Sequence, residues 1–275
     1  MYSIDELKEL ARLVRRDTLQ ALHVVGSGHP GGCLSAADIF VALYFHTLNI
    51  DPKNPKWEDR DRFLLSKGHA APALFATLAH RGYFDIHELL RVRKHDGMLQ
   101  ATPNLKVPGG DSVSGSLGQN LSIAIGTALA ARLDGKAYRT FVMLGDGEMQ
   151  EGQNWEALML APVYRLGNLI AILDRNKVQM CGTVNEILPW EDNAAEKYRA
   201  FGWNVIGVDG HDMEALIRVF DSIPNQPEGT PVMIIADTVK GKGVSFMEGK
   251  AAWHGGSPND EQMAQIDKEL GGGTL

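Results

Sequence analysis

An aspartate and an asparagine stand thirty positions apart, in a pattern that brings their side chains together. Asp146 follows the apolar run TFVML at 140–144, and Asn176 follows the apolar run LIAILD at 169–174. A helical pattern at about 151–166 separates the two runs. A strand–helix–strand unit of this length places its two strands side by side and parallel. We therefore expect Asp146 and Asn176 at the same edge of a sheet, where open α/β sheets bind their ligands.

The chemistry of these two side chains favours a hard divalent cation. Carboxylate and amide oxygens suit Mg²⁺ or Ca²⁺, and Mg²⁺ commonly completes its octahedron with substrate phosphates and water. Gly145 and Gly147 flank Asp146, and glycines allow a sharp turn and a close approach to a phosphate. The helix that follows points its N–H groups at the same place. A Gly-Asp-Gly turn alone is common, so the strand–turn–helix–strand context carries the prediction of a diphosphate–metal anchor.

Three of the nine histidines stand in segments that favour a functional site. His29 lies in the glycine-rich loop GSGHPGG, His69 follows a predicted strand, and His254 lies in the segment AAWHGG. For His29 a structural turn is an equal alternative. The chain also has Lys240 and Lys242 in TVKGKG, which could stabilise a phosphate but lack Walker spacing. The other histidines considered are interpreted as surface or packing residues: His46, His80, His87, His95 and His211.

The elements that must position these residues alternate between strands and helices. This alternation predicts a three-layer α/β/α fold with a mostly parallel central sheet. The predicted strands are 62–66, 140–144, 169–174, 203–210 and 231–239, and the predicted helices are 3–25, 35–48 with Ser35 as its N-cap, 71–81, 118–134, 151–166 and 212–223. Residues 95–117 are predicted to form a long loop, and the tail after Lys250 is expected to be extended.

Length and composition exclude several classes of protein. The 275 residues suit one domain spanning 1–275, and the formal net charge of −7 gives no electrostatic reason to expect nucleic-acid binding. No apolar run is long enough to cross a bilayer, and the N-terminus lacks a signal-peptide core. The two cysteines, Cys33 and Cys181, form no disulfide framework. We therefore expect a cytoplasmic protein with no membrane association.

Residues 145–178 resemble the thiamine diphosphate motif, with the sequence GDGEMQEGQNWEALMLAPVYRLGNLIAILDRNKV. This amino-acid sequence resembles the transketolase family in particular. Four further segments in the same order are similar to that family. They are SGHPGGCLSAADIFVALY, DRFLLSKGHAAPALFATLAHRGYF, SGSLGQNLSIAIGTALAARL and TVKGKGVSFMEGKAAWHGGSPNDEQ. The resemblance therefore covers nearly the whole chain and implies a thiamine-diphosphate-binding domain of the diphosphate (PP) type.

The resemblance also implies roles for individual residues. It implies metal ligation by Asp146, Asn176 and the backbone carbonyl of Val178, backbone hydrogen bonds from Gly147 to the diphosphate, and contacts of Gly115 and Leu117 with the cofactor rings. His69 and His254 would contact the diphosphate region, while His29 and His254 would serve acceptor binding and proton transfer. Glu151 and Glu156 either complement the helix dipole or join a carboxylate network across a subunit interface.

Two departures from the family pattern qualify the expected activity. Full-length transketolases are more than twice as long, and the part with the pyrimidine domain and its activating glutamate is not in this sequence. The chain therefore resembles the N-terminal subunit of a split transketolase, which would be inactive alone and would form an α2β2 complex with a C-terminal subunit. It would transfer a two-carbon ketol unit between sugars or sugar phosphates, with thiamine diphosphate and Mg²⁺, or Ca²⁺ as a substitute.

The second departure lies in the loop before SGSLGQ. Family members carry Gly-His-Pro there, whereas this chain reads Ala101-Thr102-Pro103. Thr102 cannot carry the charge of a histidine, although it can still make one hydrogen bond. We therefore expect weakened use of xylulose 5-phosphate, or a different donor. Two alternatives stay open: a related carboligase that uses an α-keto acid or another unusual donor, and a non-catalytic chain that binds thiamine diphosphate.

Overall fold

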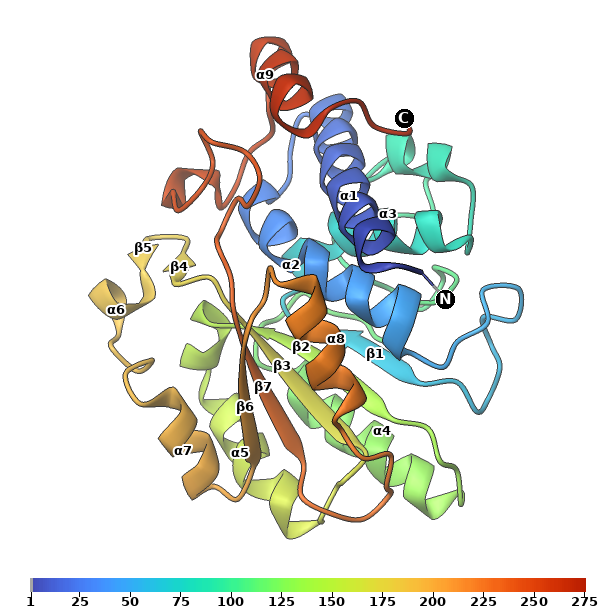
Figure 1. Cartoon of the computed structure of the whole chain (residues 1–275), viewed down its shortest axis with the longest axis vertical. Helices are drawn as coiled ribbons and strands as arrows, with labels where there is room; N and C mark the ends of the chain where they lie inside the picture. Colours follow the sequence, from blue (N-terminus) through green and yellow to red (C-terminus); the bar gives the residue numbers. More distant parts are fainter. Residues whose placement is uncertain (1) are drawn as a thin grey trace.

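The computed structural model describes residues 2–275, and within them a five-stranded sheet lies between two layers of helices (Figure 1). The strand order is β1-β2-β3-β7-β6, and every neighbouring pair is parallel. The strands are β1 Arg62–Leu65, β2 Thr140–Gly145, β3 Leu169–Arg175, β6 Asn204–Asp209 and β7 Val232–Asp237. A short antiparallel hairpin, β4 Val178–Gln179 with β5 Gly182–Thr183, follows β3. The predicted three-layer α/β fold is confirmed.

The helices cover both faces of the sheet and define two cores. One core joins the sheet to the layer of α1, α2, α3 and α8, and the other joins it to α4, α5 and α7. The helices are α1 Ile4–Val25, α2 Pro30–Ala42, α3 Ala71–Arg81, α4 Asn120–Leu133, α5 Gly152–Val163, α6 Val184–Ile187, α7 Ala194–Ala200, α8 Met213–Asp221 and α9 Asp260–Leu270. Because both faces are covered, β2 is buried along its whole length, as its continuous apolar sequence predicts.

The ends of two helices follow the signals in the sequence. Ser3 and Glu6 form a capping box at the start of α1. Gly26 ends α1 with φ 74°, and Gly82 ends α3 with φ 91°, conformations that favour glycine. Both predicted stops are therefore confirmed.

The predicted start of the second helix is wrong. Helix α2 begins at Pro30, runs into a π-helical turn at Leu43–Thr47, and contains Ser35 as a fully buried interior residue. Gly31 and Gly32 weaken the helical signal, but the close packing of this helix requires them. A Cβ on Gly31 would lie 2.7 Å from the Trp253 carbonyl oxygen, and one on Gly32 would lie 2.8 Å from His69 Nε2.

The predicted extended tail is also wrong, because residues 260–270 form α9. Asn259 and Gln262 make a capping box at its start. Met263, Ile266 and Leu270 share one face of the helix and pack into a third core against α1 and α2. This core anchors the segment that carries His254. Among residues 2–275, no helix combines the length and apolar character needed to cross a membrane.

Candidate functional site at the carboxyl edge of the sheet

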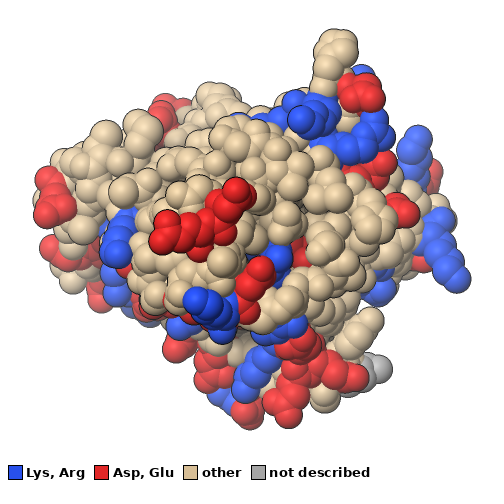
Figure 2. Space-filling model, turned by 90° about the horizontal axis from the view of Figure 1, so that it is seen from above, with Lys and Arg blue, Asp and Glu red and all other residues tan. Residues whose placement is uncertain are grey.

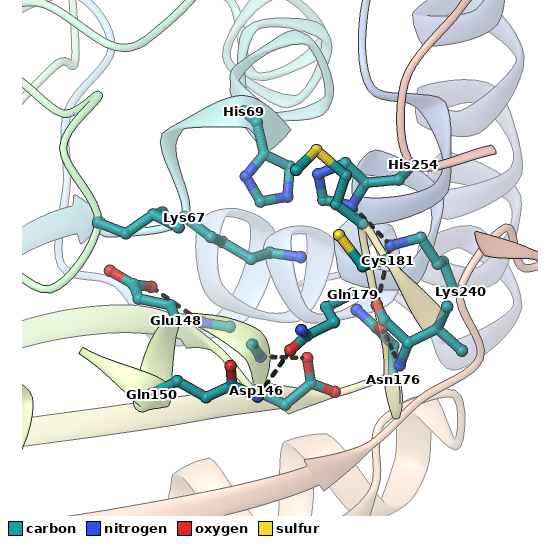
Figure 3. A pocket seen from close by; sticks show the side chains of 15 residues that line it. Lys67, His69, Asp146, Glu148, Gln150, Asn176, Gln179, Cys181, Lys240 and His254 are labelled. Atoms are coloured by element: carbon teal, nitrogen blue, oxygen red, sulfur yellow. Dashed lines mark hydrogen bonds between the residues drawn. The ribbon is translucent and has the colours of Figure 1, made fainter. Parts of the chain in front are cut away.

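Asp146 and Asn176 lie at the same edge of the sheet and line one cavity of about 290 Å³ (Figure 3). The register of β2 and β3 pairs Gly145 with Asp174, so the residues that follow each strand come out side by side. Asp146 is buried, with Oδ1 accepting from the Gly147 N–H at 2.7 Å. Its Oδ2 accepts from the backbone N–H of Lys177 at 2.5 Å. The expected meeting of Asp146 and Asn176 is therefore present in the fold.

The Val178 carbonyl also belongs to this cavity, because β4 continues from Asn176. Asn176 Oδ1 accepts from the Val178 N–H at 3.2 Å, which holds the amide in place. The carbonyl oxygen of Val178 accepts from Nζ of Lys240 at 2.9 Å. A carboxylate, an amide oxygen and a backbone carbonyl thus border the same space, which is a donor set that suits Mg²⁺ or Ca²⁺.

The electrostatics of Asp146 fit a bound cation. Burial, together with the charges of Asp174 and Glu191, raises the pKa of Asp146 to about 7. Both hydrogen bonds to its carboxylate come from backbone N–H groups, and no ion pair to it is formed within the described chain. A divalent cation would compensate that charge. Among residues 2–275, no cluster of three or more His, Cys, Asp or Glu side chains could hold a metal instead.

The fold brings His29, His69 and His254 together from three distant segments. The ring centroids lie 5.4 Å apart for His29 and His69, 5.6 Å for His29 and His254, and 5.1 Å for His69 and His254. His29 precedes α2, His69 lies in the turn after β1, and His254 lies in the segment before α9. Figure 3 shows His69 and His254 above the space that Asp146 and Asn176 border below.

Burial lowers the pKa of all three imidazoles. Burial and the nearby Lys67 hold the pKa of His69 well below its usual value. Burial, with Lys240 next in effect, lowers the pKa of His254 to about 4. Burial and the charge of Arg93 also lower the pKa of His29. Burial therefore disfavours the charged form of all three rings.

The remaining predicted site residues lie at different places around the cavity. Leu117 and Gly147 line it, whereas Gly115 lies outside it, with Thr102 Cγ2 4.0 Å from where a Cβ would stand. The chain turns directly after β2, since Gly147 begins a 3-10 turn, although its backbone is not left-handed. Its role is a close approach, because a Cβ on Gly147 would lie 2.9 Å from Gln179 Cβ. Glu151 and Glu156 are exposed and do not line the cavity.

Sequence analysis did not single out the buried network beneath the cavity. Asp174 accepts hydrogen bonds from Lys67 Nζ, from Ser35 Oγ at 2.6 Å and from the Thr238 hydroxyl. Glu148 accepts from the Gly118 N–H at 2.9 Å and the Gly145 N–H at 3.0 Å, so it ties two loops together. Lys67, like His69, follows a predicted strand, and this position was the feature of the sequence that could have indicated a site residue.

Two lysines bring positive charge to the cavity. Lys67 and Lys240 both line it, and both side chains are almost completely buried. Lys67 is paired with Asp174, whereas Nζ of Lys240 lies 2.9 Å from Nδ1 of His254. Burial and the charge of Lys67 lower the pKa of Lys240 to about 8. The cavity therefore combines oxygen ligands for a cation with positive groups that suit a phosphate.

These groups lie at the carboxyl edge of a parallel α/β sheet, the edge at which open sheets of this class bind their ligands. The chain belongs to the transketolase family: residues 6–273 match the thiamine diphosphate binding domain of transketolase. It is 42% identical over 269 residues to the 6-deoxy-6-sulfo-D-fructose transketolase subunit SqwG of Clostridium sp. (strain MSTE9), with 96% of this chain and 97% of that one covered. It is 40% identical over 256 residues to an apulose-4-phosphate transketolase subunit of Phocaeicola vulgatus, with 93% of this chain and 90% of that one covered.

The chain is also similar to part of longer transketolases. It is 41% identical over 269 residues to human transketolase. This match covers 97% of the present chain and 42% of the human one. The crystal structure of transketolase from Campylobacter jejuni has a TM-score of 0.91 and 31% identity, covering 99% of this chain and 44% of that one. The chain thus spans less than half the length of these two relatives and nearly the whole length of SqwG.

Proposed function

We propose that this chain is the diphosphate-binding, N-terminal subunit of a two-component transketolase. The observation that carries the proposal is the convergence of Asp146, Asn176 and the Val178 carbonyl on the cavity that also holds His69, His254 and Lys240. The three oxygens would ligate Mg²⁺, with Ca²⁺ as a substitute. The Gly147 N–H, His69 and His254 would bind the diphosphate of thiamine diphosphate.

The chemistry expected of the complex is transfer of a two-carbon ketol unit from a ketose to an aldose. Thiamine diphosphate, when bound, supplies the carbanion chemistry. This chain would orient the cofactor through its diphosphate, exclude water with the buried wall of the cavity, and place His29 and His254 where acceptor hydroxyls and protons are handled. A neutral imidazole is suited to this because it donates and accepts simultaneously. Gly115, Leu117 and Glu151 are proposed as further cofactor contacts.

The lengths of the relatives support a partner subunit. SqwG and the apulose-4-phosphate relative are both named as transketolase subunits, and this chain covers 97% and 90% of them. The partner would carry the pyrimidine-binding and C-terminal domains that make up the rest of full-length transketolases. We propose an α2β2 complex, located in the cytoplasm, that acts on sugars or sugar phosphates and binds neither membranes nor nucleic acids.

The donor is proposed to differ from the usual ketose phosphate. Thr102, in place of the family histidine, lies beside Gly115 in the loop before α4. The two relatives of similar length are named for 6-deoxy-6-sulfo-D-fructose and apulose 4-phosphate, which supports a donor other than the usual one. A carboligase with an α-keto acid donor is the second candidate, and Thr102 is the feature that favours it.

Reconstitution tests the proposal directly. We expect no turnover from this chain with thiamine diphosphate and Mg²⁺ alone, and ketol transfer when the second polypeptide is added. A panel of ketoses, sulfo- and phospho-sugars and α-keto acids then identifies the donor. Full turnover without a partner would overturn the two-component proposal. Cofactor binding without turnover in the complex would favour the non-catalytic alternative.

A further inference from the structure

A chain of hydrogen bonds leads from the helix layer to the segment that bears the cavity lysine. Asp38 on α2 accepts from Nη1 of Arg15 on α1 at 3.2 Å. The other oxygen of Asp38 lies 2.7 Å from Nδ1 of His211, in the turn after β6. Nε2 of His211 lies 2.8 Å from the backbone nitrogen of Val239, the residue before Lys240. His211 therefore connects a buried ion pair to the edge of the candidate site.

The partners of His211 determine where its proton is. A backbone N–H can only donate, so Nε2 of His211 accepts from Val239 and the ring proton is on Nδ1. From Nδ1 it donates to Asp38. Burial alone would raise the pKa of Asp38, but Arg15 and His211 hold it below its usual value, so the acceptor is a carboxylate. One tautomer and one ring orientation of His211 are thus fixed, and they hold the backbone at Val239.

The same reasoning applies to His254. The ammonium of Lys240 donates hydrogen bonds and cannot accept them, so Nδ1 of His254, 2.9 Å away, is the acceptor. The proton of His254 is therefore on Nε2. That nitrogen has no hydrogen-bond partner among residues 2–275, and His254 lines the cavity. The imidazole consequently presents a free N–H donor to the proposed ligand.

Packing around Lys240 leaves its side chain little freedom. A Cβ on Gly31 of α2 would lie 2.9 Å from Lys240 Cγ, so only glycine allows the lysine stem to pass. The backbone on either side is tied down as well. Gly241 N donates to the Gly31 carbonyl at 3.0 Å, and Gly249 N donates to the Lys240 carbonyl at 2.8 Å. Lys240 is therefore held in the position from which it reaches both His254 and Val178.

We propose that Lys240 and His211 are positioning residues that hold His254 in its Nε2–H tautomer, with that N–H donating to an acidic oxygen in the cavity. Lys240 acts on the ring directly, and His211 acts through the backbone of Val239. The acceptor would be a diphosphate oxygen, an assignment that rests on the proposed function. The tautomer itself belongs to the chain and does not depend on the cofactor.

Nuclear magnetic resonance of the ¹⁵N-histidine-labelled full chain tests the tautomer without activity. Two-bond ¹H–¹⁵N correlations distinguish Nε2–H from Nδ1–H. We expect Nε2–H for His254 in the wild type and in Lys240→Arg, which keeps a donor. We expect a mixture or Nδ1–H in Lys240→Met. An Nδ1–H signal in the wild type, or an unchanged His254 spectrum in Lys240→Met, would overturn the proposal.

His211→Ala tests the hydrogen bond between His211 and the backbone of Val239, which lies outside the cavity. Leaving the Val239 N–H unpaired should shift the His254 signals and weaken thiamine diphosphate binding, measured by calorimetry with Mg²⁺, by about tenfold. His211→Gln should recover most of the loss, since its amide can donate to Asp38 and accept from Val239.

His46→Ala is the matched control, because His46 lies away from the site, where it contacts Asp221 at a distance of 2.9 Å. Equal losses in His211→Ala and His46→Ala, or no rescue by His211→Gln, would contradict the positioning role. If the wild type reconstituted with the second polypeptide binds no thiamine diphosphate, the proposed function fails while the tautomer result still stands.

Discussion

At the scale of single residues, one buried carboxylate of the site is paired with a lysine, whereas another has no ion pair within the described chain. Asp174 is neutralised by Lys67, with both side chains buried in the floor of the cavity. Asp146 receives only backbone N–H groups, and its pKa is raised to about 7 by burial and by Asp174 and Glu191. A buried carboxylate in this state is costly to the fold when it ionises, so it is poised for a cation.

The raised pKa of Asp146 predicts how the cofactor-free chain depends on pH. In the unfolded chain this carboxyl has a pKa near 3.9, so between about pH 4 and 7 the folded state holds the extra proton. The free energy of unfolding therefore falls as pH rises through this range and levels off above it. Asp146→Asn should remove that fall and be more stable than the wild type at about pH 8. Urea denaturation across pH, with metal and cofactor absent and the exposed Asp134→Asn as control, measures the difference. Parallel curves for wild type and Asp146→Asn would contradict it.

Thr102 carries a prediction about the donor. A histidine at this position would restore one hydrogen bond to the hydroxyls of an ordinary ketose phosphate, worth about 1–3 kcal/mol if a buried partner is otherwise unpaired. Thr102→His in the reconstituted complex should raise kcat/KM for xylulose 5-phosphate relative to other donors, by roughly 5-fold or more. Thr102→Ser, which keeps the hydroxyl, is the matched control. An unchanged ranking of donors in Thr102→His would count against this interpretation.

At the scale of elements, the sequence revealed the parts with strong local patterns and missed the parts fixed by packing. The apolar runs of β2 and β3 predict buried parallel neighbours, and the register places Asp146 and Asn176 as expected. The start of α2 was missed because its glycines serve contacts with Trp253, Lys240 and His69 from distant segments. Asp174 and Lys67 were missed because a buried ion pair between two strand ends leaves no pattern along the chain.

Helix α9 carries the element-scale prediction. Ile266 is fully buried in the core that α9 forms with Leu19, Leu34 and Met247. Ile266→Ala should lower the free energy of unfolding by about 2–5 kcal/mol, as for other large-to-small core changes. The exposed Lys268→Ala on the same helix should change it by less than about 0.5 kcal/mol. Urea denaturation of the two variants makes the comparison, and equal stabilities would mean that α9 is not docked.

At the scale of the whole molecule, the cavity is bordered by apolar side chains that have no cover within the described chain. Met180 is 68% exposed and Leu117 is 36% exposed, and both line the cavity. Seen from above, parts of the surface are formed by residues other than Lys, Arg, Asp and Glu (Figure 2). Exposed apolar side chains such as Met180 and Leu117 beside a cavity favour an interaction site. Because the match covers 42% of human transketolase, we propose that the second polypeptide covers these side chains.

This interpretation predicts which surface mutation separates assembly from folding. Met180→Asp places a charge among the exposed apolar side chains that border the cavity. Burying that charge unpaired against the second polypeptide should weaken association by about tenfold or more. The stability of this chain should not change. Leu133→Asp is the control, because Leu133 is 84% exposed. It is the last residue of α4, toward the edge of the sheet opposite the cavity. Sedimentation of mixtures measures association, and ketol transfer should fall in proportion to the complex formed. Normal association of Met180→Asp would place the partner surface away from the cavity and contradict this interpretation.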